Sequence, residues 1–331
     1  MSKKMKYAAA LIPWAGAGDR FLASGYREAL PVRDRILKAA GLGILDGLEL
    51  RYPSEVNPET ASDILSILDD TGLALSALAV PISGESIFGK GTLTARDRRV
   101  RQTAVRRVKE GMDLCAHLGG DRVIFFLGQD GCDYAFQVDF EDAWNWMVEC
   151  LGEIASYRQD IKVCVEYKPF EPRRHIFYAN VGSALYLMER VDAANLGVLF
   201  DTGHAFLAGE TLGESVYLLH RENRLFYVHF NDNYRGFDDD LVVGSVHFLP
   251  FLEAVYWLKR VDYQGWVSLD LFPYREDAEV SVKQSIQFLK EIDAMVDAYG
   301  MEAMTELVRR GDGALASQEL YRWLFSGKGS R

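Results

Sequence analysis

Eight short, nearly continuous apolar segments, separated by longer stretches, constrain the fold of this 331-residue chain more than any other feature. The predicted strands are Tyr7–Pro13, Gly47–Arg51, Ala74–Val80, Arg122–Leu127, Lys162–Tyr167, Gly197–Asp201, Leu225–Phe230 and Trp266–Leu271. Strands that are apolar on both faces are typical of parallel sheets covered by helices on one side and by a packed interior on the other. Eight such strand-then-helix units predict a closed (β/α)8 TIM barrel.

Several connecting segments show the apolar spacing of helices. These are Ala95–His117, Phe140–Ser156 and Ala278–Tyr299, and the first two follow Thr94 and Asp139, which are residue types suited to an N-cap. A doubly wound open sheet is the structural alternative. It usually carries a G-x-G-x-x-G loop after a strand, and no such loop follows a strand here. The barrel is therefore the favoured fold.

The chain continues beyond the eighth unit. We expect residues 1–297 to form the barrel and residues 298–331 to form a C-terminal helical tail. Tyr321, Trp323 and Phe325 in this tail need an apolar surface to cover them. Two interpretations remain open. In the first, the tail packs against the barrel's own outer helices. In the second, it forms a contact between the subunits of a homo-oligomer, either a dimer or a tetramer.

Composition excludes several classes of partner. The net charge is −11 and no lysine- or arginine-rich block offsets it, which disfavours nucleic acid as a partner. No apolar run approaches the roughly 18 residues of a membrane span, so no membrane partner is expected. Four separated cysteines, without a C-x-x-C pair, indicate neither a disulfide framework nor a thiolate zinc site. A cytoplasmic protein is the expectation.

The last four predicted strands end in candidate metal ligands. These are Glu166, Asp201, His229 and Asp270, each within or directly after an apolar run. An ionised carboxylate in such surroundings is costly unless a cation or hydrogen bonds compensate for it. Chemistry in a barrel lies at the carboxyl ends of the strands, so these four side chains should meet. Three carboxylates and one imidazole suit Mn²⁺, with Mg²⁺, Co²⁺ or Zn²⁺ as alternatives.

Further candidates follow the same strands. Asp238 and Asp240, in the loop after the seventh strand, could join His204 around a second ion. Lys168 lies two residues after Glu166 and should point to the same side, where it could stabilise developing negative charge.

Three residues are candidate contacts for a substrate. Trp14 follows the first strand, Gln129 follows the fourth and His204 follows the sixth. An aromatic side chain that lines a pocket gives the apolar face of a sugar a surface to pack on, and it excludes water. Packing in the core is the alternative role for Trp14.

Three motifs resemble those of one enzyme family. EYKPFEP at 166–172, DTGH at 201–204, and HFND at 229–232 followed by DDDL-x-x-G at 238–244 are similar to motifs of the xylose isomerase-like superfamily. Within it they most resemble the L-rhamnose isomerase branch. The resemblance covers roughly residues 5–295 and leaves out the tail.

The resemblance implies a metal-dependent aldose–ketose isomerase. It implies a first ion at Glu166, Asp201, His229 and Asp270, and a second ion at His204, Asp238 and Asp240. The open-chain sugar would bind across the ions, a hydride would move between C1 and C2, and Lys168 would assist at O1. No histidine follows the first or second strand, where several xylose isomerases keep a ring-opening base. Ring opening is then left to a metal-bound water, to another residue or to the sugar itself.

Alternatives remain within the same superfamily. A ketose 3-epimerase would use metal-bound glutamates on the fifth and eighth strands as an acid–base pair, whereas the eighth strand here offers the shorter Asp270. A barrel that binds sugar without turnover is the non-enzymatic alternative. A zinc endonuclease of this barrel type would need histidines after the second and third strands, which are absent. The expected partner is a small unphosphorylated sugar, a pentose, a branched pentose such as apiose, or a deoxyhexose.

Overall fold

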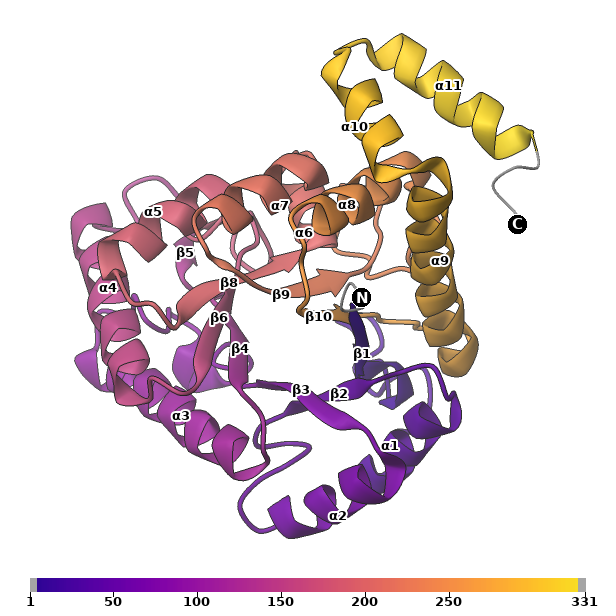
Figure 1. Ribbon diagram of the computed structural model, residues 1–331. Helices are drawn as coiled ribbons and strands as arrows, with labels where there is room; N and C mark the ends of the chain where they lie inside the picture. The colour runs from indigo at the N-terminus through magenta and orange to yellow at the C-terminus, as the bar shows by residue number, and fades with distance from the viewer. Residues whose placement is uncertain (1–4, 327–331) are drawn as a thin grey trace.

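The computed structural model describes residues 5–326, and its centre is a closed barrel of eight parallel strands (Figure 1). The order around the barrel is β1-β10-β9-β8-β6-β4-β3-β2. The barrel strands are β1 (Lys6–Ala10), β2 (Gly47–Arg51), β3 (Ala74–Ala79), β4 (Arg122–Phe126), β6 (Lys162–Glu166), β8 (Leu196–Asp201), β9 (Leu225–Phe230) and β10 (Trp266–Leu269). The predicted TIM barrel is confirmed.

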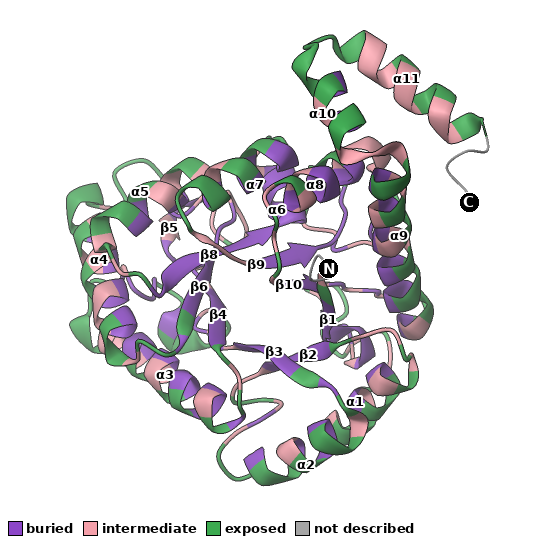
Figure 2. Cartoon of the chain, in the orientation of Figure 1, coloured by how far each residue is buried: buried purple, intermediate pink, exposed green. Residues whose placement is uncertain are grey.

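Helices surround the barrel and connect its strands (Figure 1). They are α1 (Val32–Gly41), α2 (Ala61–Thr71), α3 (Arg98–His117), α4 (Phe140–Tyr157), α5 (Val181–Val191), α6 (Thr202–Leu207), α7 (Leu212–Arg221), α8 (Phe248–Arg260) and α9 (Ala278–Tyr299). Smaller elements in the loops are the 3-10 helices η1 (Ile12–Trp14) and η2 (Ser86–Phe88), and the antiparallel pair of β5 (Gly131–Cys132) with β7 (His175–Ile176). The helix faces turned toward the strands are buried, while their outer faces are exposed (Figure 2).

The barrel interior forms the floor of the site. A buried cluster takes one residue from each of seven strands, namely Ala8, Ala77, Ile124, Cys164, Leu199, Tyr227 and Trp266. Alternate residues of a strand point to the same side, so residues two positions further along also face the interior. Glu166, Asp201 and His229 stand in this relation to Cys164, Leu199 and Tyr227. The strand register therefore aims these three side chains at the mouth of the barrel.

Two local expectations from the sequence are wrong. The first strand ends at Ala10, not at Pro13, because Ile12–Trp14 turns into η1 and Pro13 has no N–H to donate to a neighbouring strand. Thr94 does not cap α3. The cap is Asp97, whose side chain accepts from the Arg99 amide. The hydroxyl of Thr94 instead donates to Asp130, 2.6 Å away, so a loop contact replaces the cap.

The tail adds two helices after α9, α10 (Met301–Arg309) and α11 (Gly313–Phe325), which project from the barrel (Figure 1). Packing of the tail on the barrel's own outer helices is confirmed for α10, where Met304 is buried and the Thr305 hydroxyl is 3.0 Å from the Tyr256 hydroxyl of α8. No residue of α11 is buried (Figure 2). The predicted tail runs to residue 331, and its last five residues lie outside the described part of the chain. A subunit contact through this tail stays a prediction. Among residues 5–326, no helix combines the length and the apolar character needed to cross a membrane.

Candidate metal centre

Four side chains meet at the carboxyl ends of neighbouring strands. Glu166 ends β6, Asp201 ends β8, His229 lies near the end of β9 and Asp270 follows β10 directly. One potential ligand atom from each lies within 4.8 Å of the others. Within the described part of the chain, they are the one set of three or more acids, histidines or cysteines arranged in this way. The structure thus brings together the four residues expected to bind the first ion.

His229 lies at the centre of this set. Its Nδ1 is 3.3 Å from Glu166 Oε1, 3.6 Å from Asp201 Oδ2 and 3.9 Å from Asp270 Oδ2. His229 Nδ1, Glu166 Oε1 and Asp270 Oδ1 are buried and have no hydrogen-bond partner among residues 5–326. Buried polar atoms are normally paired, so converging unpaired ones indicate a ligand. Three carboxylates and an imidazole fit a divalent cation.

Neighbouring groups orient two of the four side chains. Asp201 Oδ1 accepts from the backbone amide of His204 at 2.9 Å, and Asp201 Oδ2 accepts from Asn231 Nδ2 at 2.9 Å. His229 Nε2 lies 2.8 Å from Glu49 Oε2, on the far side of the ring from the acids. Glu49 and Asn231 were not among the residues expected from the sequence. The available signal for Glu49 was a single acid within the apolar run GLELR.

The crowding of acids shifts the pKa values of the set. Burial raises the pKa of Asp270, as does repulsion from Glu49 and Glu166, and together they outweigh the attraction of His229 and bring it to about 7. Burial acts against protonation of His229, but Glu49, Asp201 and Glu166 raise its pKa well above the usual value. A cation entering the set would replace these protons.

The residues expected at a second ion lie beside the first set, and two of them pair with each other. His204 Nε2 is 3.0 Å from Asp238 Oδ2, and the same oxygen accepts from Lys168 Nζ at 2.7 Å. His204 Nδ1, which has no hydrogen-bond partner, is 3.5 Å from Glu166 Oε1. Asp240 is buried, and burial together with repulsion from Asp238 raises its pKa well above the usual value. A second ion at His204, Asp238 and Asp240 stays a prediction.

Lys168 is held as an ammonium ion in this second group. Burial lowers its pKa, but the carboxylates of Asp238 and Glu171 outweigh burial and hold it above the usual range. Glu171 Oε2 lies 3.1 Å from Lys168 Nζ. Burial likewise acts against protonation of His204, but Asp201 and Asp238 raise its pKa to about 9. The group therefore places two cationic side chains beside the four converging side chains.

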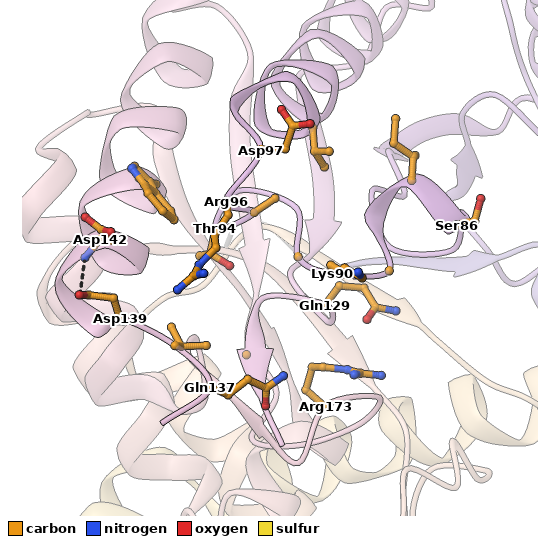
Figure 3. A pocket seen from close by; sticks show the side chains of 18 residues that line it. Ser86, Lys90, Thr94, Arg96, Asp97, Gln129, Gln137, Asp139, Asp142 and Arg173 are labelled. Carbon is orange, nitrogen blue, oxygen red and sulfur yellow. Dashed lines mark hydrogen bonds between the residues drawn. The ribbon is translucent and has the colours of Figure 1, made fainter. Parts of the chain in front are cut away.

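Trp14 and Gln129, the other expected substrate contacts, line two different cavities. Trp14 is 3% exposed and lies at a cavity beside Tyr26 and Tyr274. Gln129 lines a cavity of about 630 Å³ formed by the loops after β3, β4 and β6, and Figure 3 shows it there with Arg173. Gln129 Nε2 donates to the Ser83 carbonyl at 3.3 Å. Contact of either residue with a substrate stays a prediction.

Comparison with known proteins bears on most of the barrel. The xylose isomerase-like TIM barrel family matches residues 36–292. A xylose isomerase of Thermus thermophilus is 30% identical over 221 residues, which cover 65% of this chain and 57% of that enzyme. The match therefore spans little more than half the length of that relative.

Solved structures share the fold. A D-tagatose 3-epimerase-like protein superposes with a TM-score of 0.69 at 20% identity, covering 88% of this chain and 100% of the other. An L-ribulose 3-epimerase superposes with a TM-score of 0.71 at 17% identity, covering 92% of this chain and 98% of the other. At such identities the likeness concerns the fold alone. The family match over most of the barrel decides the assignment: this chain belongs to the xylose isomerase-like TIM barrel family.

Proposed function

We propose that this chain is a divalent-metal-dependent sugar isomerase that interconverts an aldose and a ketose. The observation that carries the proposal is the convergence of unpaired, buried atoms of Glu166, His229 and Asp270 beside Asp201. The Thermus relative is named a xylose isomerase, which supports the same reaction class. A bound divalent cation would polarise adjacent oxygens of a polyol. Mn²⁺ is the favoured ion, with Mg²⁺, Co²⁺ or Zn²⁺ as alternatives.

The proposed reaction is a 1,2-hydride shift. The hydrogen on C2 of the open-chain aldose moves with its electron pair to C1, the proton on O2 passes to O1, and C2 becomes the carbonyl carbon. Negative charge develops on O1 during this step. Lys168 is the proposed donor to O1, because Asp238 and Glu171 hold its ammonium charged and in place. The proposed substrate is a small unphosphorylated sugar, a pentose, a branched pentose such as apiose, or a deoxyhexose.

A ketose 3-epimerase is the second candidate, and one observation favours it. Glu166 and Asp270 both keep a buried oxygen without a partner, so the site holds two carboxylates that could exchange protons with a sugar. Asp270 is one methylene shorter than glutamate, which favours the role of ligand over that of proton shuttle. A barrel that binds sugar without turnover is the third reading.

Isomerisation in D₂O separates these candidates. The enzyme is assayed with a panel of aldoses and ketoses in the presence of Mn²⁺, Co²⁺ or Mg²⁺, against a chelated control, and the product is examined by NMR. A hydride shift is expected to leave C1 of the product essentially free of deuterium. Substantial deuterium on carbon would contradict the hydride shift and support proton transfer. Sugar binding without any conversion would support the non-catalytic reading.

A further inference from the structure

Glu49 and His229 are joined across the interior of the barrel. Glu49 is in β2, which pairs with β1 and β3, whereas His229 is in β9, which pairs with β8 and β10. Their side chains are 5% and 2% exposed, and Oε2 and Nε2 are 2.8 Å apart. The contact is therefore long-range and shielded from water.

This contact determines which imidazole nitrogen faces the acids. Nε2 is engaged by Glu49, so Nδ1 is the nitrogen left 3.3 Å from Glu166 Oε1 and 3.6 Å from Asp201 Oδ2. An imidazole that binds a metal ion does so through a nitrogen without a proton and donates the proton of its other nitrogen. Glu49 is placed to accept that proton, which leaves Nδ1 as the nitrogen for the ion.

In the part of the chain that the structure describes, Glu49 has no other polar partner that would explain its burial. Among residues 5–326, its side chain forms no ion pair with a lysine or arginine, and its hydrogen bond is to His229. A buried carboxylate is costly, and an apolar residue would fill a barrel interior without that cost. The acid is therefore explained by what it does to the histidine.

We propose that Glu49 is a positioning residue of the metal centre, which orients the His229 ring and fixes its proton on Nε2. This inference rests on the proposed metal-dependent function. Partners of this kind contribute to metal affinity by roughly 10- to 100-fold. Glu49 itself contacts neither the ion nor the sugar.

The test compares Mn²⁺ affinity, measured by isothermal titration calorimetry on the metal-free full chain. Glu49→Leu is expected to bind Mn²⁺ about 100-fold more weakly than the wild type, the upper end of the range for such partners. Glu49→Gln keeps an oxygen that accepts from Nε2 but loses the charge, and should bind about 10-fold more weakly. Glu55→Gln is the matched control, because the Glu55 side chain is only 8% exposed but is paired with Arg35. It should keep the wild-type affinity.

A second measurement separates positioning from a merely structural role. In the Zn²⁺-loaded wild type, ¹H–¹⁵N NMR of the histidine side chains should show the His229 proton on Nε2. A proton on Nδ1 there would overturn the proposal.

Wild-type Mn²⁺ affinity in Glu49→Gln would also overturn the proposal, even if Glu49→Leu did not fold. If the wild type bound none of Mn²⁺, Mg²⁺, Co²⁺ and Zn²⁺, the proposed function itself would fail, and the positioning role with it.

Discussion

The two halves of the barrel hold their buried acids in different ways. In the loop after β4, Asp130 is fully buried and accepts from the amides of Thr92 and Thr94 at 2.8 Å each. In the half from β6 to β10, by contrast, Glu166, Asp238 and Asp270 each keep a buried oxygen without a partner. Within residues 5–326, all buried carboxylate and imidazole atoms that lack a partner belong to this second half or its loops. A satisfied acid holds a loop, whereas an unsatisfied set indicates a site at which a ligand binds.

Among the changes that test this difference between the two halves, removing Asp201 should have the largest effect on activity. We expect Asp201→Ala to lower kcat/KM by at least about 1000-fold, because the loss of several kcal/mol of charge stabilisation by the metal translates into that factor. Titration with Mn²⁺ measures the loss of metal binding, and steady-state kinetics measure the loss of activity. Activity that persisted in Asp201→Ala under chelation would contradict the metal centre.

Asp130→Ala is the matched control, since Asp130 is also a buried acid near the end of a strand. It should lower the free energy of unfolding by about 3 kcal/mol, because the donors of Thr92 and Thr94 lose their acceptor. Its Mn²⁺ affinity should match that of the wild type. An equal loss of metal binding in both variants would remove the distinction between the two halves.

Lys168→Met should reduce kcat about 100-fold, the scale expected for the loss of one donor to a developing oxyanion. The four converging ligands remain in this variant, so Mn²⁺ binding should be kept. Lys162→Met is the control, since Lys162 is exposed at the start of β6, the strand that leads to Lys168. An unchanged kcat in Lys168→Met would remove Lys168 from the reaction and restrict the chemistry to the four ligands.

The unpaired acids should also make stability depend on metal and pH. Metal at about 100 times its Kd should add about 2.7 kcal/mol to the free energy of unfolding. The pKa values of Asp270 and His204 are raised to about 7 and about 9, above their unfolded values. Their stabilising contributions are therefore complete at low pH and are lost as the pH rises through these values.

Thermal denaturation of the chelated protein tests this dependence. Its Tm should fall between about pH 6 and about pH 9, and the rise on adding Mn²⁺ should be larger at the upper end. A chelated protein whose Tm rose over this range would contradict the sign, and the same Tm with and without metal would contradict the ligand set.

Much of the site could be predicted from the sequence because its members lie at strand ends. The apolar runs that lead to Glu166, Asp201, His229 and Asp270 mark both the strands and where they stop. Parallel strands in a barrel end at the same edge, so four separate motifs predict one location. The N-cap of α3 was mispredicted for a physical reason. Thr94 and Asp97 are both capping residue types, and the carboxylate of Asp130, which is distant in sequence, engages Thr94.

The sequence by itself determined the barrel and the four candidate ligands, because strand periodicity and strand ends are local properties of the chain. Only the tertiary structure decided how these side chains are oriented. Glu49 lies 180 positions before His229 and reaches it because closure of the barrel leaves only β1 and β10 between β2 and β9. Lys168 and Asp238, 70 positions apart, likewise meet only when the loops after β6 and β9 fold over the same mouth.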